Sequence, residues 1–84
     1  MSDPKAKMLA AFAKANPHVS PMDLAIYVDA TVQYQAAQAN IDTHGSIVIH
    51  PRTGAPIENP YLAVRDRAAR ELLAKRLQRI RQPG

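Results

Sequence analysis

Apolar residues recur at helical spacing along three stretches of the chain, and segments rich in proline, glycine and asparagine separate these stretches. The first stretch follows Asp3-Pro4, which is typical of a helix start, and ends at Asn16-Pro17. Between those signals, one stripe of a helix collects Met8, Leu9, Phe12 and Ala13. We therefore predict a short helix within residues 1–19, or an arm that becomes ordered only against a partner.

The second stretch, residues 20–44, has the pattern of one long helix with two apolar sides. Ser20 and Pro21 supply an N-cap and a proline at the first helical position, and no glycine or further proline interrupts the chain before Gly45. One side carries Leu24, Tyr27, Val28, Thr31, Tyr34, Gln38 and Ile41, and the other carries Ala25, Val32, Ala36 and Ala39. Two apolar sides require two packing partners. We expect the following helix to be one, and the first helix or a second copy of the chain to be the other.

Residues 45–59 hold most of the turn chemistry and predict a small β-hairpin. Gly45 can adopt the left-handed conformation that ends a helix, and the β-branched residues 47–49 favour an extended strand. The proline and glycine of residues 50–54 suit a chain reversal, after which residues 55–57 form a short return strand. Asn59-Pro60 then provides a cap and a helix start.

The third stretch, residues 60–84, predicts a basic helix from Pro60 to about Arg81. Its apolar arc contains Tyr61, Leu62, Ala68, Ala69, Leu72, Leu73, Leu77 and Ile80. The short connection makes the two long helices antiparallel neighbours. Arg65 and Arg76 fall inside the arc, where an unpaired charge is costly, so we expect each to meet a carboxylate or a subunit boundary. For Arg65, the nearest candidate by register is Asp42. The predicted fold is one mainly α domain with a β-hairpin connecting its two long helices.

Length and composition point to self-association. A domain of 84 residues buries a modest core, the sequence contains no cysteine, and its three histidines lack the spacing of a structural zinc site, so neither a disulfide nor a metal supplements that core. We expect a homo-oligomer, with an interface formed by Tyr27, Tyr34, Arg65, Leu73, Arg76 and Leu77. The apolar runs are far shorter than a membrane span and the N-terminus has no hydrophobic signal core, so we expect a cytoplasmic protein.

Charge is distributed unevenly along the chain. Residues 60–84 contain seven basic and two acidic side chains, whereas residues 16–59 contain one basic and four acidic side chains. This asymmetry indicates a polyanion partner, an acidic neighbouring subunit, or simply a solvated arginine-rich helix. If the partner is DNA, we expect the contacts to come from Arg67, Arg70 and Arg81, with a second group at Lys5, Lys7 and Lys14.

No catalytic constellation is visible in the sequence, and we predict a protein without enzymatic activity or cofactor. The serines occupy cap or turn positions, with no acid and base at a meaningful spacing. His44 and His50 flank the first predicted strand and either approach a phosphate or lie as surface histidines in a turn. The tyrosines at helical spacing are either stacking residues for bases or, more commonly, part of a core.

The order of these elements resembles the small terminase subunit of tailed bacteriophages. The resemblance runs from Ser20 to Leu72 and is most specific from Gly45 to Leu62, where a turn, a strand, a Thr-Gly turn and the Asn-Pro-Tyr-Leu helix start follow one another. It implies a non-enzymatic component of the genome-packaging motor in the bacterial host cytoplasm. Such a component assembles into a ring, engages double-stranded viral DNA and modulates the large ATPase–nuclease subunit. One alternative is a protein-only helical scaffold. The other is a small transcriptional regulator, which is disfavoured because the sequence shows no helix-turn-helix spacing.

Overall fold

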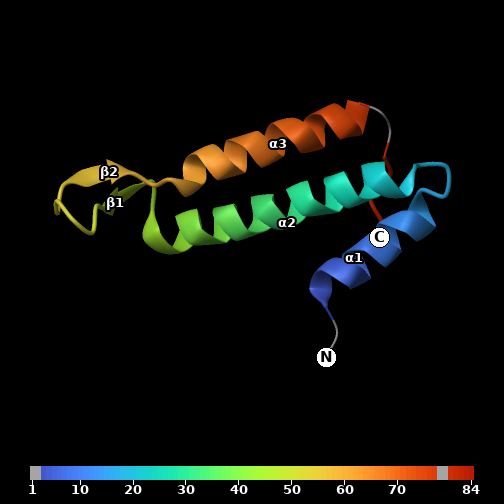
Figure 1. Ribbon diagram of the computed structural model, residues 1–84, viewed down its shortest axis with the longest axis horizontal. Coiled ribbons are helices and arrows are strands. Elements are labelled where there is room, and N and C mark those ends of the chain that lie inside the picture. Colours follow the sequence, from blue (N-terminus) through green and yellow to red (C-terminus); the bar gives the residue numbers. More distant parts are fainter. Residues whose placement is uncertain (1–2, 78–79) are drawn as a thin grey trace.

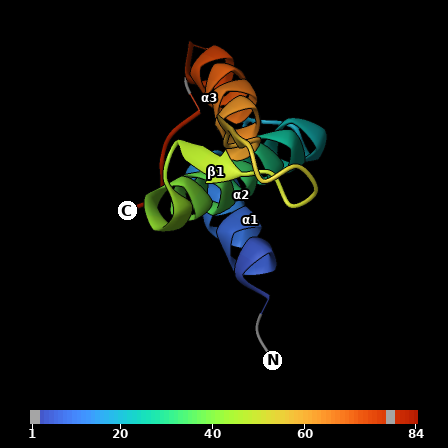
Figure 2. The same cartoon turned by 90° about the vertical axis from the view of Figure 1, so that its left-hand side faces the viewer.

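The computed structural model describes residues 3–77 and 80–84, except for the side chains of Arg76 and Leu77. It contains three helices, α1 (Pro4–Ala15), α2 (Pro21–His44) and α3 (Tyr61–Leu77), and two strands, β1 (Ile47–Ile49) and β2 (Pro56–Glu58). Figure 1 shows α2 and α3 side by side, with the hairpin projecting beyond one end of the pair. Figures 1 and 2 both place α2 between α1 and α3. The predicted fold class is confirmed.

Each helix begins at the cap that the sequence predicts. The side chains of Asp3 and Ser20 accept hydrogen bonds from the backbone N–H groups of Lys5 at 3.0 Å and Asp23 at 3.1 Å. Asn59 accepts one from the backbone N–H of Tyr61 at 2.9 Å. These bonds satisfy N–H groups that have no partner within the first helical turn, and α3 begins one residue after Pro60.

The connection between α2 and α3 depends on two glycines with positive φ. Gly45 has a φ of 85° and ends α2 by donating its N–H to the carbonyl of Ile41 at 2.7 Å. Gly54 has a φ of 70° in the hairpin turn, where the Nδ1 atom of His50 accepts hydrogen bonds from the N–H groups of Arg52 and Thr53. The return strand occupies Pro56–Glu58, one residue later than predicted.

Asn59 ties the base of the hairpin to both long helices. Its amide nitrogen donates to the side-chain oxygen of Asn40 at 2.9 Å and to the carbonyl of Gly45 at 3.0 Å, while its side-chain oxygen caps α3. The residue is buried, so these bonds replace those that water would supply. The cap function of Asn59 was predicted from its position before Pro60, but its two bonds to α2 and Gly45 were not.

The core lies where α1 and the C-terminal segment meet α2. It contains Phe12, Leu24, Tyr27, Val28 and Ile80. The rings of Phe12 and Tyr27 have centroids 5.0 Å apart and a tilted arrangement, which is favourable for an aromatic pair. This contact confirms that α1 packs against one side of α2. Ala30 and Ala37 are also fully buried, although neither belongs to the two sides predicted for this helix.

The prediction that the third helix continues to about Arg81 is wrong. The described part of α3 ends at Leu77, and Ile80 lies outside any helix with only 5% of its surface exposed. Asn16, which is fully buried, donates its side-chain N–H to the carbonyl of Arg81 at 2.8 Å and accepts the N–H of Arg81. The tail, residues 80–84, therefore buries an apolar side chain and forms two backbone hydrogen bonds to Asn16 instead of continuing the helix. Pro83 also disfavours helical backbone at the residue before it.

Candidate functional site

Two of the arginines predicted to contact DNA lie together on α3. Arg67 and Arg70 are both exposed, and they are three residues apart, so they are neighbours on the helix surface. α2 and α3 pack against each other, and the exposure of both arginines shows that they face away from that contact. The two guanidinium groups are accessible to a large partner, beside the exposed carboxylates of Asp66 and Glu71 on the same helix.

Arg81 does not belong to that surface. The sequence predicts it on the same helix as Arg67 and Arg70, but it lies in the C-terminal segment, where Asn16 of the α1–α2 connection holds its backbone. Its side chain is exposed. The predicted cluster of three arginines on one helix is therefore wrong, because α3 does not continue far enough to carry the third.

The basic residues of α1 form a separate group. Lys7 and Lys14 are exposed, and Lys5 forms an ion pair with Asp29 of α2. The hydrogen bond and charge of Asp29 raise the pKa of Lys5 above its ordinary value. Since α2 lies between α1 and α3 in both views, these lysines are on the other side of the molecule from α3.

Arg65 is half-buried and engaged within the chain. Its guanidinium contacts the carboxylate of Asp66 at 3.2 Å and the side-chain oxygen of Gln38 at 3.4 Å. Gln38 in turn donates to Asp42 at 2.9 Å. The expected meeting with a carboxylate is confirmed, but Asp42 as that carboxylate is wrong, because Gln38 occupies the position next to the guanidinium.

A further ion pair joins the two long helices at the end remote from the hairpin. The ammonium of Lys75 on α3 lies 3.1 Å from a carboxylate oxygen of Asp23 in the first turn of α2. The hydrogen bonds from Lys75 and Ser20, together with the Lys75 charge, lower the pKa of Asp23 below its ordinary value. This contact stabilises the packing of the helices at the end remote from the hairpin.

The residues predicted for a subunit interface occupy different environments. Tyr27 is buried in the core, Tyr34 is half-buried, and Leu73 has 58% of its surface exposed. The side chains of Arg76 and Leu77 lie outside the described part of the chain. Leu73 is therefore the one described aliphatic member of the predicted set that a second molecule can reach directly.

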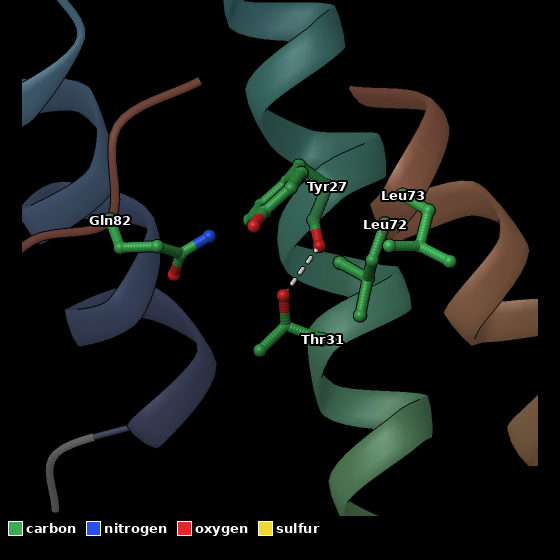
Figure 3. A pocket seen from close by; sticks show the side chains of 5 residues that line it. All are labelled: Tyr27, Thr31, Leu72, Leu73 and Gln82. Atoms are coloured by element: carbon green, nitrogen blue, oxygen red, sulfur yellow. Dashed lines mark hydrogen bonds between the residues drawn. The ribbon is translucent and has the colours of Figure 1, made fainter. Parts of the chain in front are cut away.

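Leu73 lies on an open groove between α2, α3 and the tail. The groove has a volume of about 300 Å³ and is lined by Tyr27, Thr31, Leu72, Leu73 and Gln82. Figure 3 shows the two leucines on the α3 side, Tyr27 and Thr31 on α2, and Gln82 across from them on the tail. The Thr31 hydroxyl donates to the carbonyl of Tyr27 at 2.9 Å, so it is already occupied. The lining is mainly apolar, so the groove is suited to an apolar side chain.

Sequence reasoning missed Gln82 and Asn16, on which the groove and the tail depend. Both act through contacts with segments far away in the chain, and neither has a local sequence signal beyond the helix stop Asn16-Pro17. Among the described residues, no group of three or more histidine and acidic side chains could hold a metal ion. No helix within the described part is long and apolar enough to cross a membrane.

Comparison with known proteins is consistent with the order of helix, hairpin and helix. Residues 6–76 match the family model described as phage terminase, small subunit, and this match includes α2, the hairpin and almost all of α3. No curated protein and no solved structure matches the chain. A family match over most of the chain is sufficient to establish membership, and the chain belongs to the phage terminase small subunit family.

Proposed function

We propose that this protein is a homo-oligomeric, non-enzymatic adaptor that engages viral DNA and regulates the large ATPase–nuclease subunit during genome packaging. Membership of the terminase small subunit family supports a role in phage DNA packaging and is the observation that carries the proposal. The adaptor acts in the cytoplasm of the bacterial host, where the motor is assembled. In this proposal the adaptor binds the DNA and the large subunit and positions them relative to each other.

Self-association is supported by apolar side chains that the single chain leaves exposed. Large exposed apolar residues occur on every described helix and on β1, and they include Leu9, Met22, Ile26, Ile47, Ile49, Tyr61, Val64 and Leu73. Burying such surface between subunits is favourable by roughly 25 cal/mol per Å². Leu73→Glu tests this contribution cleanly, because Leu73 is largely exposed in the single chain and its replacement should leave the fold intact while it weakens assembly.

DNA contact is supported by the exposed pair Arg67 and Arg70. One subunit offers few basic side chains to the phosphates, and non-specific DNA binding typically has a Kd of about 10⁻⁴ to 10⁻⁶ M. Repetition of the pair in an assembly would raise the affinity without new contacts. Phosphate contacts position a protein without reading bases, so these arginines provide affinity rather than sequence preference.

The test is DNA binding across a salt series for the native protein and for Arg67→Ala/Arg70→Ala. Removal of each arginine–phosphate pair should reduce the salt slope by about 0.9. Arg81→Ala, Lys7→Ala/Lys14→Ala and the control Arg52→Ala, at the hairpin turn, are measured in parallel. If the Arg67/Arg70 variant stays assembled and keeps both the affinity and the slope of the native protein, DNA does not bind at α3. If the native protein shows no salt-dependent DNA binding, the protein-only scaffold becomes the better account.

A further inference from the structure

The hairpin presents an apolar face that nothing in the described chain covers. Because residues directly opposite each other in a sheet point to the same side, the register pairs Ile47 with Glu58 and Ile49 with Pro56 on one face. Ile47 and Ile49 have 58% and 64% of their surface exposed. Val48 and Ile57, on the other face, are half-buried. A two-stranded hairpin is only marginally stable alone in water, so a partner for the exposed face would stabilise it.

The groove lined by Tyr27, Leu72 and Leu73 lies at the other end of the helical pair and has a mainly apolar lining. It accepts an apolar side chain, and one of its walls is the exposed Leu73. The hairpin of the same molecule cannot reach it, because the helical rise from Tyr27 to His44 along α2 is about 25 Å at ~1.5 Å per residue. Figure 1 shows the hairpin projecting away from the helices at the end remote from the tail.

The charged residues near the two surfaces have opposite signs. Glu58 is the acidic residue on the apolar face of the hairpin, opposite Ile47. On the groove side, Arg70 precedes Leu73 by one turn of α3, and Arg81 precedes Gln82 in the tail. Both arginines are exposed, so their charge would attract a carboxylate that approaches with the two isoleucines.

We propose that the Ile47 and Ile49 face of one copy docks in the groove of a second copy. The inference rests on the proposed self-association and assigns its surfaces. The two surfaces differ, so the contact is head-to-tail, and repetition generates a ring where the rotation closes and a filament where it does not. Each subunit then places its hairpin in the groove of one neighbour and receives the hairpin of another neighbour in its own groove.

Cysteine cross-linking tests the pairing directly, because the chain contains no native cysteine. Ile49→Cys and a tagged Leu73→Cys are mixed, oxidised and separated without reductant, and the linked peptides are identified by mass spectrometry. We expect a disulfide between the two variants. Met22→Cys, exposed in the first turn of α2, replaces Leu73→Cys in the matched control and should give no such product with Ile49→Cys. The double variant Ile49→Cys/Leu73→Cys should give a ladder of covalent multimers.

The outcomes separate this inference from the function on which it rests. If light scattering shows an oligomer but no 49–73 disulfide forms, the docking contact is wrong and self-association stands. Disulfides between two copies of Ile49→Cys, with none to Leu73→Cys, would show that the subunits pair hairpin to hairpin and not hairpin to groove. A protein that remains a single chain in light scattering overturns both.

A charge exchange gives a second readout. Glu58→Arg and Arg70→Glu should each reduce the measured mass, and their combination should restore it. Failure of the combination to recover assembly, with both single variants folded, contradicts a contact between Glu58 and Arg70. The DNA affinity of the restored double variant, compared with that of the native protein, then shows how much Arg70 contributes to DNA binding.

Discussion

Asn16 is the residue on which the attachment of the tail depends. Its fully buried side chain bonds to the carbonyls of Phe12 and Arg81 and to the N–H of Arg81. Asn16→Ala removes the hydrogen-bond partners of the Arg81 N–H and carbonyl, while the Phe12 carbonyl keeps the backbone N–H of residue 16, and such a loss typically costs about 1–3 kcal/mol of unfolding free energy. Chemical denaturation should show this loss, while the exposed control Gln33→Ala stays near the native value. Equal stabilities of the two variants would mean that the tail contributes nothing to the fold.

Asp23 makes the stability of the helical pair sensitive to acid. The hydrogen bonds and charge that Lys75 and Ser20 supply lower its pKa in the folded protein relative to the unfolded value of about 3.9. Its stabilising contribution is therefore present above about pH 4 and is lost as pH falls through the lower folded pKa.

Comparison of thermal midpoints for the native protein and Asp23→Asn measures this contribution. The gap between them should be constant from about pH 8 to 5 and should shrink as the pH falls below about 4. Asp42→Asn removes a carboxylate that no described ammonium or guanidinium contacts, and serves as the control. A gap for Asp23→Asn that is unchanged down to about pH 2 would contradict the role of the Lys75 ion pair.

At the scale of elements, the connection between α2 and α3 is the most constrained segment. Gly45 has a φ of 85° and a ψ of 176°, a conformation that residues with a side chain rarely adopt. A Cβ atom at Gly45 would have only the carbonyl of Ile47 within 4 Å, at 3.9 Å, so Gly45→Ala introduces backbone strain without a clash. We expect a loss of about 1–3 kcal/mol in chemical denaturation, against little change for the neighbouring control Ser46→Ala. A native-like midpoint for Gly45→Ala would show that the connection tolerates another backbone path.

The elements could be predicted from the sequence where their causes are local. Asp3, Ser20 and Asn59 each bond to a backbone N–H two or three residues ahead, so their positions in the sequence were sufficient to place the helix starts. The end of α3 could not be predicted this way. It depends on Asn16, 65 residues away from Arg81, and on a core position that only the assembled helices create for Ile80. Asp42 was mistaken as the partner of Arg65 because the register between α2 and α3 places Gln38 beside the guanidinium, and the carboxylate that Arg65 contacts is that of its neighbour Asp66.

At the scale of the whole molecule, the chain has an elongated shape with extents of 50 × 33 × 21 Å and a core concentrated around α1, α2 and the tail. The hairpin and much of α3 lie outside that core and carry exposed apolar residues. Small domains bury a limited fraction of their surface, so this distribution favours stabilisation by further copies. Self-association was predicted from composition, but the groove and the hairpin face emerge only from the tertiary structure.

The central claim is that the protein works as an assembly, and the most direct test is its mass in solution. Light scattering coupled to size-exclusion chromatography, at about 100 μM and moderate salt, should give a multiple of the single-chain mass, because interfaces of ordinary size persist at that concentration. Dilution should leave a well-defined species, and Leu73→Glu should lower the mass while it keeps the native helical content. A folded native protein that elutes with the mass of one chain at that concentration would contradict the account.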